Sequence, residues 1–148
     1  RGLGDVYKRQ LRGLLALAAN DDSIASADFD VLEKLDPEGL ATAIGKASLL
    51  TKHGRAAEAL PYLRRMASLD PQPEHYAVLA ETLLSLGNLS EAGETIKTGM
   101  EKYPDNADLY FCRAKLHRDL YELDRAREDA KKALRLGIPR DKIKELKL

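Results

Sequence analysis

The sequence is poor in the residues that support covalent cross-links and enzyme chemistry. Its 148 residues include one cysteine, no tryptophan, three histidines and only 5% aromatic residues. A single cysteine excludes an intramolecular disulfide and a zinc site built from several cysteines. No apolar run approaches the ~20 residues that a membrane-spanning helix needs. Excess charge is absent too, since 24 lysines and arginines balance 24 aspartates and glutamates. The overall charge therefore gives no reason to expect nucleic acid or an anionic membrane as partner.

Catalytic motifs are also missing. The sequence contains no G-x-S-x-G, no H-E-x-x-H, no phosphate-binding loop and no G-x-G-x-x-G. Cys112 and His117 lie five residues apart, whereas two ligands on one helix face need a spacing of three or four. We therefore predict no catalytic residue, no metal site and no cofactor, and interpret the chain as a protein that is not an enzyme.

The first ten residues differ from the rest. Residues 5–10, with the sequence DVYKRQ, resemble the translated end of a transposon used to prepare sequencing libraries. We interpret residues 1–10 as not native, and the chain as a fragment that has lost its natural amino terminus. The alternative is a natural basic start of a helix. In the first interpretation a signal peptide would be lost as well, so the sequence assigns no compartment.

A period of about 34 residues organises residues 11–148. Two series of residues carry it: Ala25, Ala59, Ala92 and Ala126, and Pro37, Pro71 and Pro104. Within each period the apolar residues recur at steps of three and four, which predicts two amphipathic helices per unit. We expect a partial unit over 11–39, full units over 40–72, 73–106 and 107–139, and a capping helix over 140–148. The paired helices should lie near 11–19 and 23–35, 39–53 and 55–69, 73–86 and 89–102, and 107–120 and 123–136.

The best-formed unit reads Tyr76-x2-Leu79-Ala80-x2-Leu83, then Ala92-x3-Ile96 and Pro104. On these residues the chain resembles the tetratricopeptide repeat (TPR) family, whose pattern is W-x2-L-G-x2-Y, A-x3-F and P. The resemblance extends from about Leu11 to Pro139. It implies an all-α fold, a right-handed α-solenoid of stacked antiparallel helix hairpins. Several residues depart from the pattern. Tyr121 stands where a turn glycine is expected, and residues 20–23 replace the glycine of the first turn. Lys46 and Arg113 stand at positions that are usually apolar, and Pro61 lies inside a predicted helix, where we expect a kink or a late start.

The resemblance also implies a binding function, because stacked hairpins form a concave groove that the first helix of each unit lines. Residues off the packing stripe of these helices are expected to face the groove: Ile44, Ser48, Thr51, Lys52, Ala77, Glu81, Leu84, Phe111, Lys115 and Arg118. We predict that Ile44, Leu84 and Phe111 anchor an extended or helical peptide. Lys115 and Arg118 would pair with an acidic group on that peptide. The lysine and asparagine clamp of one family subtype is absent, since Ile44, Ser48 and Val78 hold the comparable places.

We therefore interpret the chain as a bacterial-type, non-catalytic scaffold that binds a peptide or protein segment. One alternative is a regulatory or docking segment of a larger protein. The other is a nucleic-acid binder that uses the carboxyl-terminal end, where residues 124–148 hold nine basic and five acidic side chains. That segment has no aromatic residue to stack on bases, so we expect no nucleic-acid partner.

Overall fold

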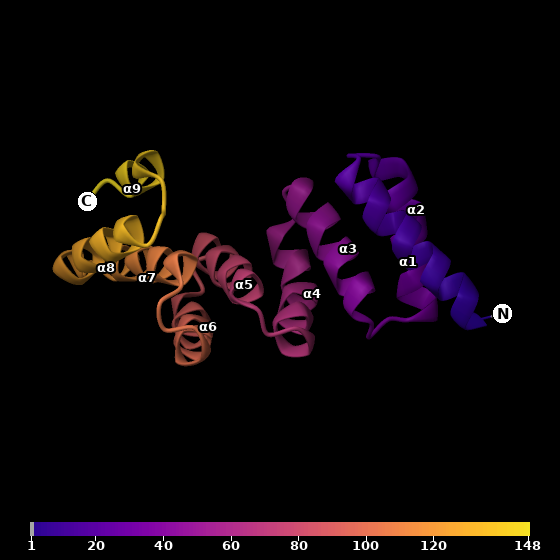
Figure 1. Cartoon of the computed structure of the whole chain (residues 1–148), viewed down its shortest axis with the longest axis horizontal. Coiled ribbons are helices and arrows are strands. Elements are labelled where there is room, and N and C mark those ends of the chain that lie inside the picture. The colour runs from indigo at the N-terminus through magenta and orange to yellow at the C-terminus, as the bar shows by residue number, and fades with distance from the viewer. Residues whose placement is uncertain (1) are drawn as a thin grey trace. The chain divides into compact units, whose positions relative to one another are not determined.

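The computed structural model describes residues 2–148, which form nine α-helices and no strand within that range (Figure 1). The helices are α1 (Gly2–Ala18), α2 (Asp22–Leu35), α3 (Leu40–Lys52), α4 (Ala56–Leu69), α5 (Pro73–Ser85), α6 (Leu89–Lys102), α7 (Ala107–Asp119), α8 (Leu123–Arg135) and α9 (Arg140–Glu145). The ends of α2 to α8 lie within a residue of the ranges expected from the periodicity. By contrast, α1 begins at Gly2, well ahead of residue 11, and its Val6 packs against the core.

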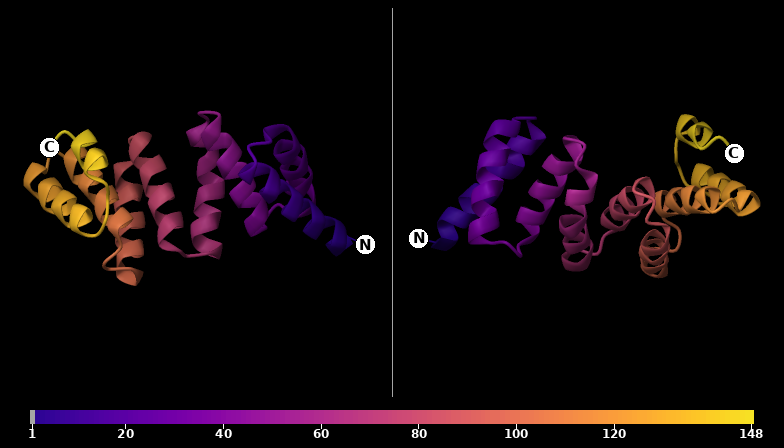
Figure 2. Two further views of the ribbon diagram at one scale, coloured as in Figure 1. Left: turned by 45° about the horizontal axis from the view of Figure 1, so that its top comes forward. Right: turned by 180° about the vertical axis from the view of Figure 1, so that it is seen from behind.

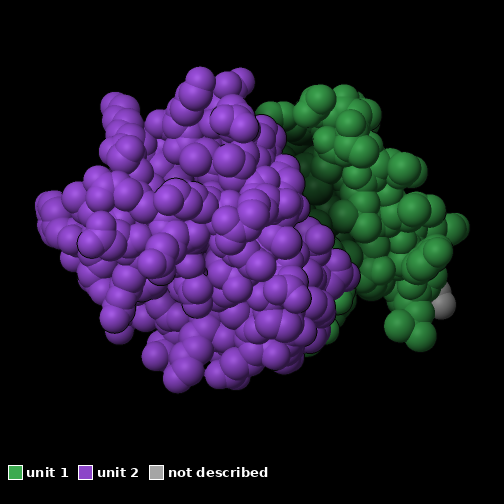
Figure 3. Space-filling view, turned by 60° about the vertical axis from the view of Figure 1, so that its left-hand side comes forward, with its two compact units in different colours: residues 1–70 green, residues 71–148 purple. Residues whose placement is uncertain are grey.

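The chain divides into two compact units, residues 1–70 and residues 71–148 (Figure 3). Unit 1 contains the hairpins α1/α2 and α3/α4, and unit 2 contains α5/α6, α7/α8 and α9. In unit 1, α3 packs against both helices of the hairpin before it, and α7 does the same in unit 2 (Figure 2). The predicted all-α fold of stacked helix hairpins is thereby confirmed.

Phe29 lies at the centre of the core of unit 1. Its side chain is fully buried and packs with Ala16, Ala25, Leu32 and Leu49. The ring also lies against Gly13 of α1 and Gly45 of α3, where a Cβ atom would clash with it. Because neither glycine has a side chain, α1 and α3 can both approach the ring that α2 supplies.

The core of unit 2 continues from α5 to α9. Gly99 of α6 lies so close to its neighbours that an added Cβ would be 3.1 Å from Tyr76 Cβ and 3.1 Å from Leu109 Cδ1. At the carboxyl-terminal end, Leu146 and Ile138 pack against Phe111 of α7. Ile143 of the short helix α9 packs against the same cluster, so the carboxyl-terminal segment covers the apolar flank of the last hairpin, as a terminal repeat requires.

The turn inside each hairpin contains one residue with a left-handed backbone. These residues are Asn20 (φ 58°), Gly54 (φ 73°), Gly87 (φ 77°) and Tyr121 (φ 62°). Tyr121 replaces the expected glycine without changing the turn, since α7 ends at Asp119 and α8 begins at Leu123. Its side chain is 89% exposed, so the cost is the backbone strain alone, about 1–2 kcal/mol for a residue with a Cβ.

Candidate functional site: a charged pocket beside the last hairpin

The predicted groove residues of unit 1 lie on α3. Ser48, Thr51 and Lys52 are exposed, and Ile44 is half-buried. Lys52 Nζ donates to Asp22 Oδ1 of α2 at 2.8 Å, and this hydrogen bond is the main reason why the pKa of Asp22 is lowered. These four residues stay predicted groove residues.

The groove residues predicted in unit 2 divide into buried and accessible ones. Ala77, Leu84 and Phe111 are only 8%, 7% and 6% exposed, which differs from the expectation that they face a groove. Ala77 lies under α7, where its carbonyl oxygen is 3.7 Å from Cys112 Sγ. Phe111 is covered by Leu146 and Ile138. Leu84 and Phe111 thus pack in the core of unit 2 and are not surface anchors in this structure.

The accessible residues Glu81, Lys115 and Arg118 line one pocket of about 370 Å³. Glu81 comes from α5, and Lys115 and Arg118 come from α7. The rest of the lining consists of Lys142 and Glu145 of α9, Leu146 directly after that helix, and Phe111 of α7. Sequence reasoning missed the α9 residues, because the repeat pattern assigns the groove to the first helices alone.

Cationic side chains outnumber carboxylates around this pocket. Lys115, Arg118 and Lys142 face Glu81 and Glu145. Lys115 Nζ lies 3.0 Å from Glu81 Oε1 and 4.4 Å from the centre of the Phe111 ring. Arg118 Nε donates to Asp119 Oδ1 of its own helix at 3.0 Å. Both ion pairs are solvent-accessible, so each is worth at most about 1 kcal/mol and can exchange for a ligand carboxylate.

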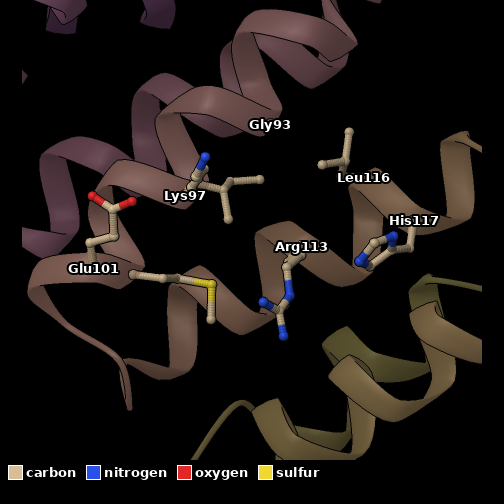
Figure 4. Close-up of a pocket in the computed structure, with 8 residues that line it drawn as sticks. Gly93, Lys97, Glu101, Arg113, Leu116 and His117 are labelled. Carbon is tan, nitrogen blue, oxygen red and sulfur yellow. The ribbon is translucent and has the colours of Figure 1, made fainter.

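A second pocket of unit 2, of about 310 Å³, lies between α6 and α7 (Figure 4). Its apolar floor consists of Ile96, Met100 and Leu116, and Gly93 leaves it open. His117 stands at its edge with Nε2 3.5 Å from Asp129 Oδ2 and Nδ1 3.5 Å from Glu122 Oε1. The side chain of His117 is only 16% exposed.

In unit 1, the region that corresponds to the α6–α7 pocket lies between α2 and α3, and it is polar. Lys46, which corresponds to Arg113, pairs with Asp30 and Glu33 of α2. The Tyr62 hydroxyl also donates to Glu33, and this hydrogen bond is the main cause of the lowered pKa of Glu33. Glu33, Lys46 and Tyr62 line a pocket of about 510 Å³, together with Arg55, Glu58 and Arg65. The pocket of unit 1 therefore has more charged residues in its lining than the pocket between α6 and α7.

The one cysteine of the sequence lies in the interior of unit 2. Cys112 is fully buried, and this burial raises the pKa of its thiol far above the ordinary value. Residues 2–148 contain no group of three histidine, cysteine or carboxylate side chains that could hold a metal ion. Within the same residues, no helix combines the length and the apolar character needed to cross a membrane.

Residues 50–116 match the family model of the tetratricopeptide repeat. A solved tetratricopeptide repeat protein from Parabacteroides merdae is 27% identical, with a TM-score of 0.68; the match covers 95% of this chain and 56% of that one. A thermophilic TPR protein from Thermus thermophilus is 23% identical, with a TM-score of 0.71 and coverages of 95% and 80%. MamA from Desulfovibrio magneticus is 19% identical, with a TM-score of 0.76 and coverages of 88% and 75%. Among curated proteins, none matches the sequence.

Proposed function

We propose that this chain is a scaffold for protein–protein interaction of the tetratricopeptide-repeat type, since residues 50–116 match the model of that family, and that it binds an acidic peptide segment in the pocket between α5, α7 and α9. The scaffold itself is non-catalytic. The proposal depends on one observation. Lys115 and Arg118 of α7 and Lys142 of α9 all line the same pocket.

The size and lining of the pocket set what it accepts. A volume of about 370 Å³ holds one or two side chains, not a whole domain. Lys115 and Arg118 would donate to a carboxylate of the ligand, in charge-assisted hydrogen bonds that are stronger than neutral ones. Lys115 Nζ lies 4.4 Å from the centre of the buried Phe111 ring. This cation–π contact holds the ammonium group in place before the ligand binds. A peptide with aspartate or glutamate beside a small apolar residue fits these features.

The experiment is a selection of peptides from a random library, followed by affinity measurements on the variants Lys115→Glu/Arg118→Glu and Lys97→Glu. Lys97 is an exposed lysine of the other pocket of unit 2, so its variant controls for the general change in charge. We expect the double variant to lose at least about tenfold in affinity, while Lys97→Glu binds as the original chain does.

Circular dichroism of each variant verifies that the helices are intact. If the correctly folded double variant keeps its affinity, the pocket is not the binding site. Phe111 is not a suitable probe, because truncating a side chain that is 6% exposed removes core packing and costs about 3–5 kcal/mol.

A further inference from the structure

The pocket between α6 and α7 has no part in the function proposed above. Its volume of about 310 Å³ lies at the lower end of the range for small-molecule pockets, roughly 300–1,000 Å³. Ile96, Met100 and Leu116 form its apolar floor. Ile96 and Leu116 are buried, and the flexible thioether side chain of Met100 adapts to the shape of an apolar guest. The floor therefore suits an aliphatic group.

The charged residues at the rim of this pocket come from both helices. Lys97 and Glu101 lie one turn apart on α6, and Arg113 lies on α7 (Figure 4). Within residues 2–148 neither Lys97 nor Glu101 forms an ion pair, and both residues are exposed. Arg113 donates to Asp129 with Nε and Nη2, and its Nη1 group remains as a further donor. Two cations from neighbouring helices thus have donors to offer to a ligand.

The corresponding place in unit 1 holds two carboxylates. Asp30 and Glu33 of α2 both pair there with Lys46 of α3. In the repeat register Lys97 replaces Asp30, and a methionine replaces Glu33. Arg113 replaces Lys46, so α6 presents a cation to α7 where α2 presents carboxylates to α3. A carboxylate from outside the chain would complete in unit 2 the pairing that unit 1 makes by itself.

We infer that the pocket between α6 and α7 binds a small carboxylic acid with an unbranched aliphatic chain. The aliphatic chain lies on the apolar floor, and the carboxylate accepts hydrogen bonds from Lys97 Nζ and Arg113 Nη1. Such charge-assisted hydrogen bonds are stronger than neutral ones. Glu101 carries the same charge as the ligand, so it weakens binding. The inference does not depend on the acidic-peptide proposal, because the two pockets share no residue.

Titration of the isotope-labelled chain with octanoate at neutral pH, followed by the amide chemical shifts, tests the inference. We expect saturable shifts at the residues that line the pocket, with a Kd in the millimolar range for so small a ligand. Octanol has a similar chain without the charge, and octylammonium has the opposite charge. Both should bind more weakly than octanoate. Octylammonium that binds as tightly as octanoate overturns the inference, and so does the lack of any saturable shift.

Two neighbouring residues of α6 should act in opposite directions. Lys97→Gln removes a donor and should weaken octanoate binding about threefold, whereas Glu101→Gln removes the like charge and should strengthen binding about twofold. The control is Lys144→Gln in α9, an exposed lysine outside the pocket, which should leave the affinity unchanged. Since all three side chains are exposed, the fold should tolerate these changes. Equal affinities of Lys97→Gln and Lys144→Gln overturn the inference.

Gly93 tests the apolar part of the site. It lines the pocket, and the nearest atom to an added Cβ is Leu116 Cδ2 at 3.5 Å. Gly93→Leu therefore places a side chain where the ligand would lie, and octanoate affinity should fall at least about tenfold. Circular dichroism verifies that this variant folds. A folded Gly93→Leu variant that keeps its affinity overturns the inference.

Two comparisons separate this site from other occupants and from the acidic-peptide pocket. Lys115→Glu/Arg118→Glu should leave octanoate binding unchanged, whatever that double variant does to peptide binding. Loss of octanoate binding in it overturns the inference, because the acid then lies in the other pocket. A short peptide with a carboxyl-terminal leucine should displace octanoate less readily than another aliphatic acid does. A peptide that displaces it more readily overturns the choice of ligand, because the occupant is then a chain terminus.

Discussion

Arg113 and Asp129 form a bidentate ion pair that joins the two helices of the last hairpin. Arg113 Nε donates to Asp129 Oδ2 at 2.8 Å, and Nη2 donates to Oδ1 at 2.9 Å. Arg12 and Asp28 form the same pair in the first hairpin, at 2.8 and 2.6 Å. In both pairs the aspartate is buried and lies 16 residues after the arginine. The same ion pair therefore joins the two helices of a hairpin in each unit.

Removal of Arg113 should destabilise unit 2. Arg113→Met removes the Nε and Nη2 groups that donate to Asp129. Asp129 is only 6% exposed, so water replaces these donors poorly. Since the Arg113 side chain is itself 38% exposed, solvent screens part of the loss. We expect the free energy of unfolding to fall by about 1–3 kcal/mol in urea denaturation.

The matched control is Arg127→Met, because the side chain of its partner Asp124 is fully exposed. This change should stay within about 0.5 kcal/mol. The double variant Arg113→Met/Asp129→Met should recover much of the stability, since it leaves no unpaired buried charge. Equal losses for Arg113→Met and Arg127→Met would contradict this account of the pair.

The first hairpin should lose stability in acid through Asp28. The hydrogen bond from Arg12 is the main reason why the pKa of Asp28 is lowered, and burial opposes it. A lowered folded-state pKa stabilises the folded state above the unfolded-state pKa of aspartate, about 3.9. This stability is lost as the pH falls from there through the folded-state pKa.

The free energy of unfolding of Arg12→Met should therefore lie furthest below that of the original chain above about pH 4. Below that pH the two curves should converge. Urea denaturation between pH 7 and the acid limit measures the difference. A difference that does not change with pH means that Asp28 does not depend on Arg12 for its charge.

Two helical glycines should respond in opposite ways to alanine. At Gly45 an added Cβ clashes with the ring of Phe29, which is fully buried and cannot move aside. We expect Gly45→Ala to lower the free energy of unfolding by about 1–3 kcal/mol. At Gly93 the nearest atom to an added Cβ is Leu116 Cδ2 at 3.5 Å, an ordinary contact. Gly93→Ala should raise the free energy of unfolding by up to about 1 kcal/mol, through helix propensity. Changes of the same sign would show that the packing around Phe29 is looser than described.

Cys112 should behave as a buried, inert thiol. It is fully buried, and its burial raises the pKa of the thiol, whereas the thiolate is the form that attacks a thiol reagent. In the native protein a thiol reagent should therefore label Cys112 at the rate of unfolding, independent of reagent concentration at high excess. In denaturant the labelling should be immediate. Rapid labelling of the folded chain would require an opening of the α5–α7 contact that the structure does not contain.

The pocket could be predicted only in part. Lys115 and Arg118 follow from the helical register of α7 alone, because residues four and seven positions after Phe111 share one side of a helix. The burial of Phe111 does not follow, since the expected capping helix over 140–148 does not by itself determine which residues of α7 it covers. The carboxylates that pair with Lys46 and Arg113 could not be predicted from the sequence either. Both residues stand out in sequence as polar residues at apolar positions, but Lys46 pairs with the preceding helix and Arg113 with the following one.

The sequence by itself determined the helices, their turns and their pairing into hairpins. These depend on local spacing, and the 34-residue period repeats the same local signal along the chain. Only the tertiary structure decided which side chains reach solvent. Burial at Phe111 and the pairing of Asp129 each depend on which other helix lies opposite, and residues distant in sequence contribute that surface.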